Sequence, residues 1–290
     1  MTSPFPSWFE PAPPQRLDAL ARVAYAVTLF MVFRNDDFAV IHGWAPRSFY
    51  KPVAIGRLLH IPAPTHTTLV LLEMVITAGC LVGFTRRAPR VTAGVVLVAF
   101  ALWISWAFGY GKVDHDRLTI LVAFAAFACT PRTGPDVEEK TGWALRVIQV
   151  VFVLAYPFSA ITKLRLAGLR WPGSAVFARA IIRRGTPMGH WLLTPPILLQ
   201  VGQWAFLGFE LLAVVALLKP GKLRNVALVG ILFLHLFTWS TIGISFVAHT
   251  TFLLAFLPLE RWSPWVRRRL GLPPRHPASA PASDPQLQPA

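Results

Sequence analysis

Long runs of apolar residues, separated by short polar connections, make up most of this chain. Four runs are long enough to be membrane-spanning helices: Thr67–Phe84, Val91–Tyr110, Thr141–Thr162 and Ile197–Leu218. A helix that crosses the hydrocarbon layer needs about 20 mostly apolar residues, with a range of about 17–25. The pattern therefore predicts membrane-spanning helices instead of a water-soluble domain.

Three further segments fit this interpretation less closely. Leu17–Phe33 is apolar but carries two charged residues near its start, and Leu118–Thr130 is short. The stretch Asn225–Pro258 is too long for one span, and glycine and hydroxyl residues near its middle permit a tight turn. We divide it near Thr241–Gly243, which predicts an all-α, polytopic transmembrane helix bundle of about eight spans.

The predicted bundle occupies the middle of the chain. Residues 1–16 form a polar, proline-rich N-terminus, residues 17–258 the transmembrane domain, and residues 259–290 a basic and then proline-rich tail. The tail from residue 273 onward is rich in Pro, Ala, Ser and Gln, a composition typical of disorder. The first apolar run is not followed by a small-residue cleavage pattern, so we expect no cleavable signal peptide.

Composition agrees with a membrane protein. Of the 290 residues, 54% are hydrophobic and 14% charged, whereas a soluble domain carries about a quarter charged residues. Mean hydropathy is +0.53. The net charge of +15 does not indicate nucleic-acid binding, because the basic residues lie between the apolar runs instead of lining one face.

Cys80 and Cys129 lie inside apolar runs and no zinc-like spacing occurs, so we expect no disulfide framework and no metal site.

Basic clusters orient the predicted bundle. With eight spans, three clusters fall on the same side as the N-terminus: Arg86, Arg87 and Arg90; Lys219, Lys222 and Arg224; and Arg267, Arg268 and Arg269. The positive-inside rule makes this side, and both termini, cytoplasmic.

Three longer connections then lie outside: Arg34–His66, Gly111–Arg117 and Lys163–Pro196. The last one also holds several arginines, and its segment Ser174–Arg184 has the pattern of a helix lying in the membrane interface. We expect a multi-pass protein of the cell membrane.

Ionisable residues within or beside spans are costly and therefore often functional. His115 lies between Asp114 and Asp116, whose charges favour its protonated form near neutral pH. The alternative is a solvated loop in which Asp114 caps the next helix. Lys163 either extends to the interface with its stem in lipid, or folds back into the bundle, where a neutral amine is a usable general base. The residues alone leave both pairs of alternatives open.

Four ionisable residues lie inside predicted spans: Glu73, Glu210, His235 and His249. A lone carboxylate at such a position usually faces the bundle and finds a hydrogen-bond partner. Because Glu210 and His235 lie on consecutive spans, they could meet as a structural pair or as a proton-handling pair. The chain has no Walker A loop, dinucleotide fingerprint or serine elbow, which argues against a nucleotide-driven pump and a soluble-type hydrolase.

A family resemblance joins these features. The segment Ser159–Gly173, with its Lys-Leu and Trp-Pro-Gly sequences, resembles the KL…W…G segment of the HTTM family, the horizontally transferred transmembrane proteins related to vitamin K-dependent γ-glutamyl carboxylase. His115 followed by Leu118–Ala128 resembles the family's histidine-plus-helix segment. The order of residues in the closing helices is also similar: Glu210, Arg224, His235 and Phe246. The resemblance covers roughly Leu17–Pro258.

The resemblance implies a chemistry at the outer face. In the carboxylase, a lysine at the position of Lys163 deprotonates a reduced quinone, an epoxide results, and a histidine at the position of His115 assists. A quinone of the vitamin K or menaquinol type is therefore the implied cofactor, with Trp171, Glu210 and His235 as candidates to bind it. Residues 260–290 are too short to replace the large β-rich region of the carboxylase, which puts peptide glutamate carboxylation in doubt.

Two other classes of function stay open. A non-enzymatic membrane partner or maturation factor for a secreted peptide would depend on the loop Lys163–Pro196 and not on the amine of Lys163. A transporter would need a water-accessible polar path, and the small number of ionisable residues inside the predicted spans makes this class less favourable.

Overall fold

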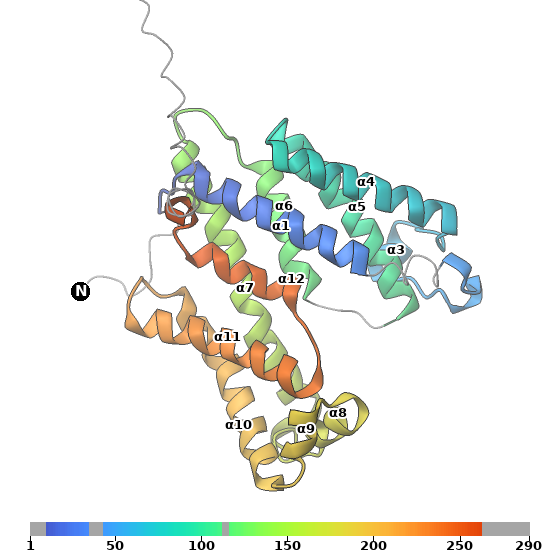
Figure 1. Cartoon of the computed structure of the whole chain (residues 1–290), viewed down its shortest axis with the longest axis vertical. Coiled ribbons are helices and arrows are strands. Elements are labelled where there is room, and N and C mark those ends of the chain that lie inside the picture. Colours follow the sequence, from blue (N-terminus) through green and yellow to red (C-terminus); the bar gives the residue numbers. More distant parts are fainter. Residues whose placement is uncertain (1–9, 35–42, 112–115, 263–290) are drawn as a thin grey trace, which may run out of the picture.

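The computed structural model describes residues 10–34, 43–111 and 116–262 of the chain. In these residues every regular element is a helix, and no β-strand is present. The prediction of an all-α fold is therefore confirmed for the part of the chain that the structure describes (Figure 1).

Six long helices build the molecule: α1 (Pro14–Arg34), α4 (His66–Thr85), α5 (Pro89–Tyr110), α7 (Val137–Ala167), α10 (Pro196–Leu212) and α11 (Lys222–Ile242). Shorter helices connect or complete them: α3 (Ala54–Leu58), α6 (Arg117–Cys129), α8 (Val176–Arg184), α9 (Pro187–Leu192) and α12 (Val247–Thr250). Short 3-10 segments are Arg47–Phe49, Gly168–Arg170, Ala213–Leu217, Thr251–Phe256 and Leu259–Arg261.

Five helical segments among the described residues are long and apolar enough to cross a membrane: His66–Thr85, Pro89–Tyr110, Val137–Arg170, Pro196–Leu217 and Lys222–Ile242. The chain is therefore a multi-pass, helical membrane protein. The other three predicted spans are also helical, but α1 is not among the five, α6 has 13 residues, and α12 with the following 3-10 segment covers only Val247–Phe256. The total of eight spans stays a prediction.

Helix α7 lies at the centre of the arrangement. On one side α1, α4, α5 and α6 pack together, and on the other α10 and α11 pack with the short helices α8 and α9 (Figure 1). Helix α7 contacts α1, α6 and α10, so it joins the two groups. Its residue Pro157 has no amide hydrogen to donate to the carbonyl of Val153.

Local sequence signals set several helix ends. Thr65 caps α4 through a reciprocal pair of hydrogen bonds with Thr68. Helix α11 ends at Ile242, and Gly243 follows with a φ of 66°, a left-handed conformation that glycine adopts without the steric cost of a side chain. The predicted break near Thr241–Gly243 is therefore confirmed, and the chain turns there into the segment that contains α12.

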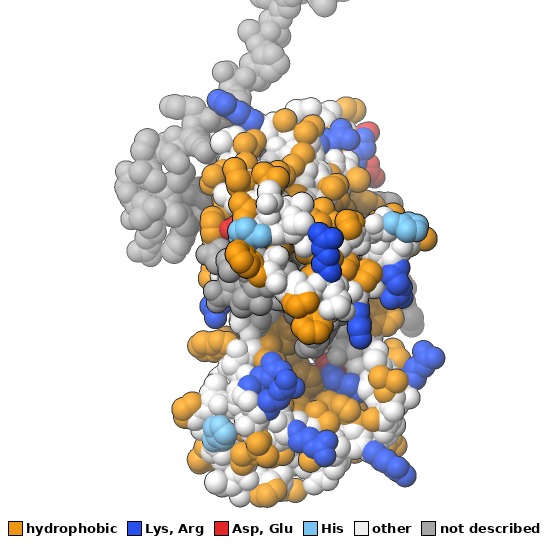
Figure 2. Space-filling view, turned by 90° about the vertical axis from the view of Figure 1, so that its right-hand side faces the viewer, with side chains coloured by type: hydrophobic (Ala, Val, Ile, Leu, Met, Phe, Trp, Pro, Cys, Tyr) orange, Lys and Arg blue, Asp and Glu red, His pale blue; other side chains and the backbone are white. Residues whose placement is uncertain are grey.

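The outer surface carries many large apolar side chains. Met74 on α4, Val98 on α5, Ile197 on α10 and Phe233 on α11 are all more than half exposed. Figure 2 shows hydrophobic side chains spread over one face of the molecule with lysines and arginines among them. Surfaces of soluble monomers do not expose apolar area on this scale, and lipid is the solvent that matches it.

The predicted grouping of basic connections agrees with the described contacts at one end of the bundle. Asp18, near the start of α1, forms ion pairs with Arg86 in the α4–α5 turn and with Arg132 between α6 and α7. The amide of Ala12 donates to the carbonyl of Glu138 at the start of α7. These contacts bring the α4–α5 and α6–α7 connections to the same end as the beginning of α1. The cluster Arg267–Arg269 lies outside the described residues, and the cytoplasmic assignment of this end stays a prediction.

The last described turn is held at this end by a bidentate ion pair. Arg16 donates to the two carboxylate oxygens of Glu260 at 2.8 and 2.7 Å. These hydrogen bonds lower the pKa of Glu260, because they favour its ionised form. The resulting stabilisation is fully present above the unfolded-state pKa of about 4.3 and is lost as the pH falls through the lower pKa of the folded protein.

We predict that Glu260→Gln lowers the free energy of unfolding at pH 7 by about 1 kcal/mol, as for a partly exposed bidentate pair. The difference from the wild type should shrink as the pH falls below about 4.3. Thermal unfolding in detergent over a series of pH values measures it. Glu139→Gln, on the exposed first turn of α7, is the matched control and should change stability less. A Glu260→Gln effect that is the same at every pH would contradict the ion-pair interpretation.

Candidate functional site

Polar side chains gather where α7 and α10 face each other. On α7, Tyr156, Ser159 and Lys163 are three and four residues apart and therefore lie along one face of the helix. On α10, Gln203 and Glu210 are two helical turns apart and both are buried. The two faces meet toward the C-terminal end of α7, and there Lys163 on α7 pairs with Glu210 on α10.

Lys163 is the centre of this site. Its Nζ donates to both carboxylate oxygens of Glu210 and to the hydroxyl of Ser159 at 2.9 Å. An ammonium has three N–H donors, so these contacts match its full capacity. The Lys163 side chain is 21% exposed and that of Glu210 5%. Of the two arrangements that the sequence left open for Lys163, the structure has the one that folds back into the bundle.

Two aromatic rings complete the surroundings of the ammonium. Nζ of Lys163 lies 5.1 Å from the ring centre of Trp171 and 4.9 Å from that of Phe206, distances at which a cation is attracted to the face of an aromatic ring. Phe177 of α8 makes edge contacts with both rings. The amine is therefore enclosed by one carboxylate, one hydroxyl and aromatic faces.

Gln203 holds the loop that carries Trp171. Its Nε2 donates to the carbonyls of Pro172 and Ser174 at 2.7 and 2.8 Å, and its Oε1 accepts from the amide of Phe177 at 3.1 Å. Gln203 is 1% exposed. A buried amide with three backbone partners fixes this loop against α10 and so positions the Trp171 ring over Lys163.

A second polar cluster lies deeper in the bundle, two turns along α7 from Lys163. The hydroxyl of Tyr156 and Nε2 of His235 are 2.6 Å apart. The His235 ring packs against that of His249, with ring centres 5.8 Å apart, and Nδ1 of His249 lies 2.9 Å from the hydroxyl of Thr119 on α6. These groups link α11, α7, α12 and α6. Glu210 thus bonds Lys163 and His235 bonds Tyr156, although the sequence suggested that the two could meet.

An apolar cavity of about 520 Å³ opens between α6 and α7 beside Lys163. Most of its lining is apolar, from Leu118, Val151, Leu154, Ala155 and Phe158. Its polar lining residues are Thr119, Ser159, Thr162 and Lys163. The cavity can hold a hydrophobic molecule with polar atoms at the position of the amine. His115 lies outside the described residues, but the first turn of α6 after it contributes Leu118 to this cavity.

Among the described residues, those predicted from sequence fall into two groups. Lys163, Glu210 and Trp171 lie together in one site, and His235 belongs to the neighbouring cluster around Tyr156. The sequence interpretation did not single out Gln203, Phe206 or Tyr156. For Gln203 a signal existed, because it precedes Glu210 by seven residues and so shares its helix face. The aromatic residues carried no such signal among the many in the chain.

Comparison with known proteins adds no assignment to this geometry. No family model matches the chain, and neither the curated proteins nor the solved structures contain a match to it. Among the described residues, no group of three or more His, Cys, Asp and Glu side chains is placed to hold a metal ion. What the site can do must therefore be argued from its own side chains.

We predict that Gln203→Ala lowers the free energy of unfolding by about 1–3 kcal/mol, because buried backbone partners lose their hydrogen bonds. Limited proteolysis should also cut the chain after Arg170 faster than in the wild type, since the loop is no longer held. Gln200→Ala, one turn earlier on α10 and less buried, is the control. Equal stability and equal cleavage in the two variants would show that Gln203 does not hold the loop.

A double-mutant cycle tests the ion pair. We expect Glu210→Gln and Lys163→Met each to lower the free energy of unfolding by about 2–3 kcal/mol, somewhat less than for a fully buried pair. The double variant Lys163→Met/Glu210→Gln should recover most of this loss, because it leaves no buried charge without a partner. Thermal unfolding in detergent is the measurement.

The exposed pair Lys140–Asp136, 3.5 Å apart at the start of the same helix, is the matched control. Its disruption by Lys140→Met should change the free energy of unfolding by at most about 0.5 kcal/mol. If Glu210→Gln is no more harmful than Lys140→Met, the Lys163–Glu210 pair does not stabilise the bundle.

Proposed function

We propose that this chain is an integral protein of the cell membrane, of the HTTM and vitamin K-dependent carboxylase-like type. It would bind a reduced quinone between α6 and α7 and use Lys163 as a base. The observation that carries the proposal is that Lys163, whose amine is hydrogen-bonded to Glu210, lines an apolar cavity.

The cavity suits a lipid-soluble ring compound. Its volume of about 520 Å³ lies within the range of about 300–1,000 Å³ that is usual for small-molecule sites. Leu118, Leu154 and Phe158 offer contacts to an apolar ring or chain, and Ser159, Thr162 and Lys163 of α7 add polar residues to the lining. A bound quinol would supply the redox chemistry, including its reaction with oxygen.

The surroundings of Lys163 favour an exchange of its proton. An ammonium cannot act as a base, so the lysine must first lose a proton, and Glu210 accepts hydrogen bonds from Nζ through both oxygens. Transfer of one proton from Nζ to Glu210 would replace an ion pair by two neutral groups, which apolar surroundings favour. Ser159 would then keep the neutral amine oriented. The lone pair on Nζ would be available to take a proton from a hydroxyl in the cavity.

Epoxide formation tests the proposal. Protein in detergent would receive reduced menaquinone or vitamin K and oxygen, and the quinone epoxide would be measured. We expect Lys163→Ala to lower the rate by about 100-fold or more, as for loss of a general base. Lys163→Arg keeps the positive charge, but a guanidinium does not deprotonate; it should retain most of the stability and lose the activity. Lys140→Ala, at the exposed start of the same helix, should leave the rate unchanged.

The proposal fails if the wild type makes no more epoxide than Lys163→Ala. A peptide-maturation role would instead be supported if a specific peptide co-purifies equally with the wild type and with Lys163→Ala. That role would depend on the loop 163–196, so disruption of the loop should release such a peptide.

A further inference from the structure

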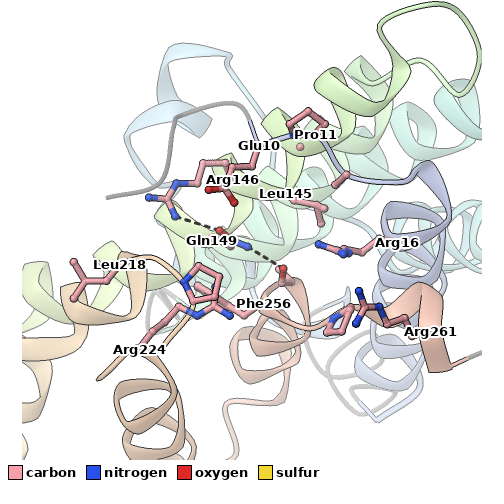
Figure 3. A pocket seen from close by; sticks show the side chains of 15 residues that line it. Glu10, Pro11, Arg16, Leu145, Arg146, Gln149, Leu218, Arg224, Phe256 and Arg261 are labelled. Carbon is pink, nitrogen blue, oxygen red and sulfur yellow. Dashed lines mark hydrogen bonds between the residues drawn. The ribbon is translucent and has the colours of Figure 1, made fainter. Parts of the chain in front are cut away.

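Arginines from separate parts of the chain converge on a cavity at the opposite end of α7. The cavity has a volume of about 370 Å³. Its lining comes from the N-terminal segment before α1, the first turns of α7, the turn before α11 and the end of the described chain. Four of the lining residues are arginines: Arg16, Arg146, Arg224 and Arg261. Figure 3 shows their side chains around the same space.

This cavity is separate from the Lys163 site. Arg146 and Lys163 are 17 positions apart on α7, which corresponds to about 25 Å along a helix. The contacts of Asp18 with the α4–α5 turn place the cavity at the end that the loop charges predict to be cytoplasmic. A ligand here would therefore be independent of a ligand at Lys163.

The four guanidinium groups are not equally available. Arg16 is held by Glu260 through two hydrogen bonds. Arg146 donates to the carbonyl of Leu217 at 3.1 Å and more weakly to Gln149 at 3.4 Å. The Nε atoms of Arg146 and Arg224 are buried and have no hydrogen-bond partner among the described residues. Buried N–H groups without an acceptor are costly, and an anion in the cavity would supply the acceptors.

The balance of charge around the cavity favours an anion. Glu260 is engaged with Arg16, and Glu10 is the other carboxylate in the lining. Glu10 interacts electrostatically with both Arg146 and Arg224, and Glu260 interacts with Arg261 as well as with Arg16, so these four guanidinium groups are matched by two carboxylates. Arginine is suited to phosphate because its planar donors match two oxygens at once.

Close packing shapes the cavity. The N-terminal segment crosses α7 at Gly142, where a Cβ atom would overlap the carbonyl oxygen of Glu10. Only glycine allows this approach, which places Glu10 and Arg16 on the rim. Leu145, Phe256 and Pro258 add apolar surface to the same lining. A mixture of arginines and apolar side chains at the end of a membrane-spanning bundle matches a lipid phosphate with its adjoining glycerol.

We propose that this arginine-lined cavity binds a phosphate group, supplied by the headgroup of an anionic phospholipid. Basic pockets between membrane helices bind such headgroups because cation and phosphate attract each other at the membrane surface. The phosphate oxygens would accept from Arg146 and Arg224, and Arg261 would lie at the entrance.

Retention of lipid tests the proposal. Protein is reconstituted in phosphatidylcholine nanodiscs with or without phosphatidylglycerol, extracted into detergent, and the bound lipid is measured by mass spectrometry. We expect the wild type to retain phosphatidylglycerol over phosphatidylcholine. Arg146→Gln/Arg224→Gln should bind it about tenfold more weakly. Arg179→Gln/Arg183→Gln, which removes two arginines from the distant helix α8, should bind it like the wild type.

Two single variants keep the test decisive if the double variant does not fold. Arg261→Gln, at an exposed position, should weaken retention of phosphatidylglycerol. Glu10→Gln removes the competing carboxylate from an exposed position and should strengthen it severalfold. If Glu10→Gln retains no more phosphatidylglycerol than the wild type, the Glu10 carboxylate does not compete with a bound phosphate.

Inorganic phosphate distinguishes the source of the ligand. If phosphate in detergent raises the unfolding temperature of the wild type but not of Arg261→Gln, and phosphatidylglycerol is not retained, the cavity binds phosphate from solution and the lipid assignment is wrong. If neither probe distinguishes the wild type from the cavity variants, or the α8 control loses lipid equally, the proposal is overturned.

Discussion

In hydrocarbon, an ammonium and a carboxylate are tolerated only as partners, because neither can be left without compensation for its lost hydration. The pairing of Lys163 with Glu210 meets this constraint, and the packing of α10 against the end of α7 depends on it. It joins α7 to α10, which are otherwise connected by apolar packing. It also determines the surroundings of the amine, since Trp171 and Phe206 can enclose a cation that already has its counter-charge.

The same constraint explains the polar groups around this pair. Gln203 is buried and bonds three backbone groups, and Tyr156 is bonded to His235. Each of these contacts joins elements that are distant in sequence. A buried polar group that is fully hydrogen-bonded permits few alternative packings, so these contacts specify how α10, α11 and the loop after α7 fit against α7. The candidate site is therefore built from contacts that also stabilise the bundle.

Helix α7 separates two electrostatic environments. Near its end, one lysine meets one carboxylate beside an apolar cavity. Near its beginning, Arg146 takes part in a cluster where guanidinium groups outnumber carboxylates. The first arrangement suits exchange of a proton within a low-dielectric space, and the second suits an anion at the membrane surface. One helix thus connects a proposed reaction site with a proposed anchoring site, and each can be altered without changing the other.

The sequence by itself determined the class of protein, a multi-pass helical membrane protein. Apolar runs of bilayer-spanning length and few charged residues show directly which segments are suited to lipid. It also pointed to Lys163 and Glu210, since ionisable residues in such runs need a reason to be there, whereas Trp171 was indicated by the family resemblance. Only the tertiary structure decided which groups meet. Whether Lys163 extends to the interface or turns inward depends on a carboxylate 47 residues away, and the partners of Gln203, His235 and Arg146 likewise come from other elements. Pairings of this kind depend on how the helices pack against one another in space. The pattern of residues along one helix does not specify that packing.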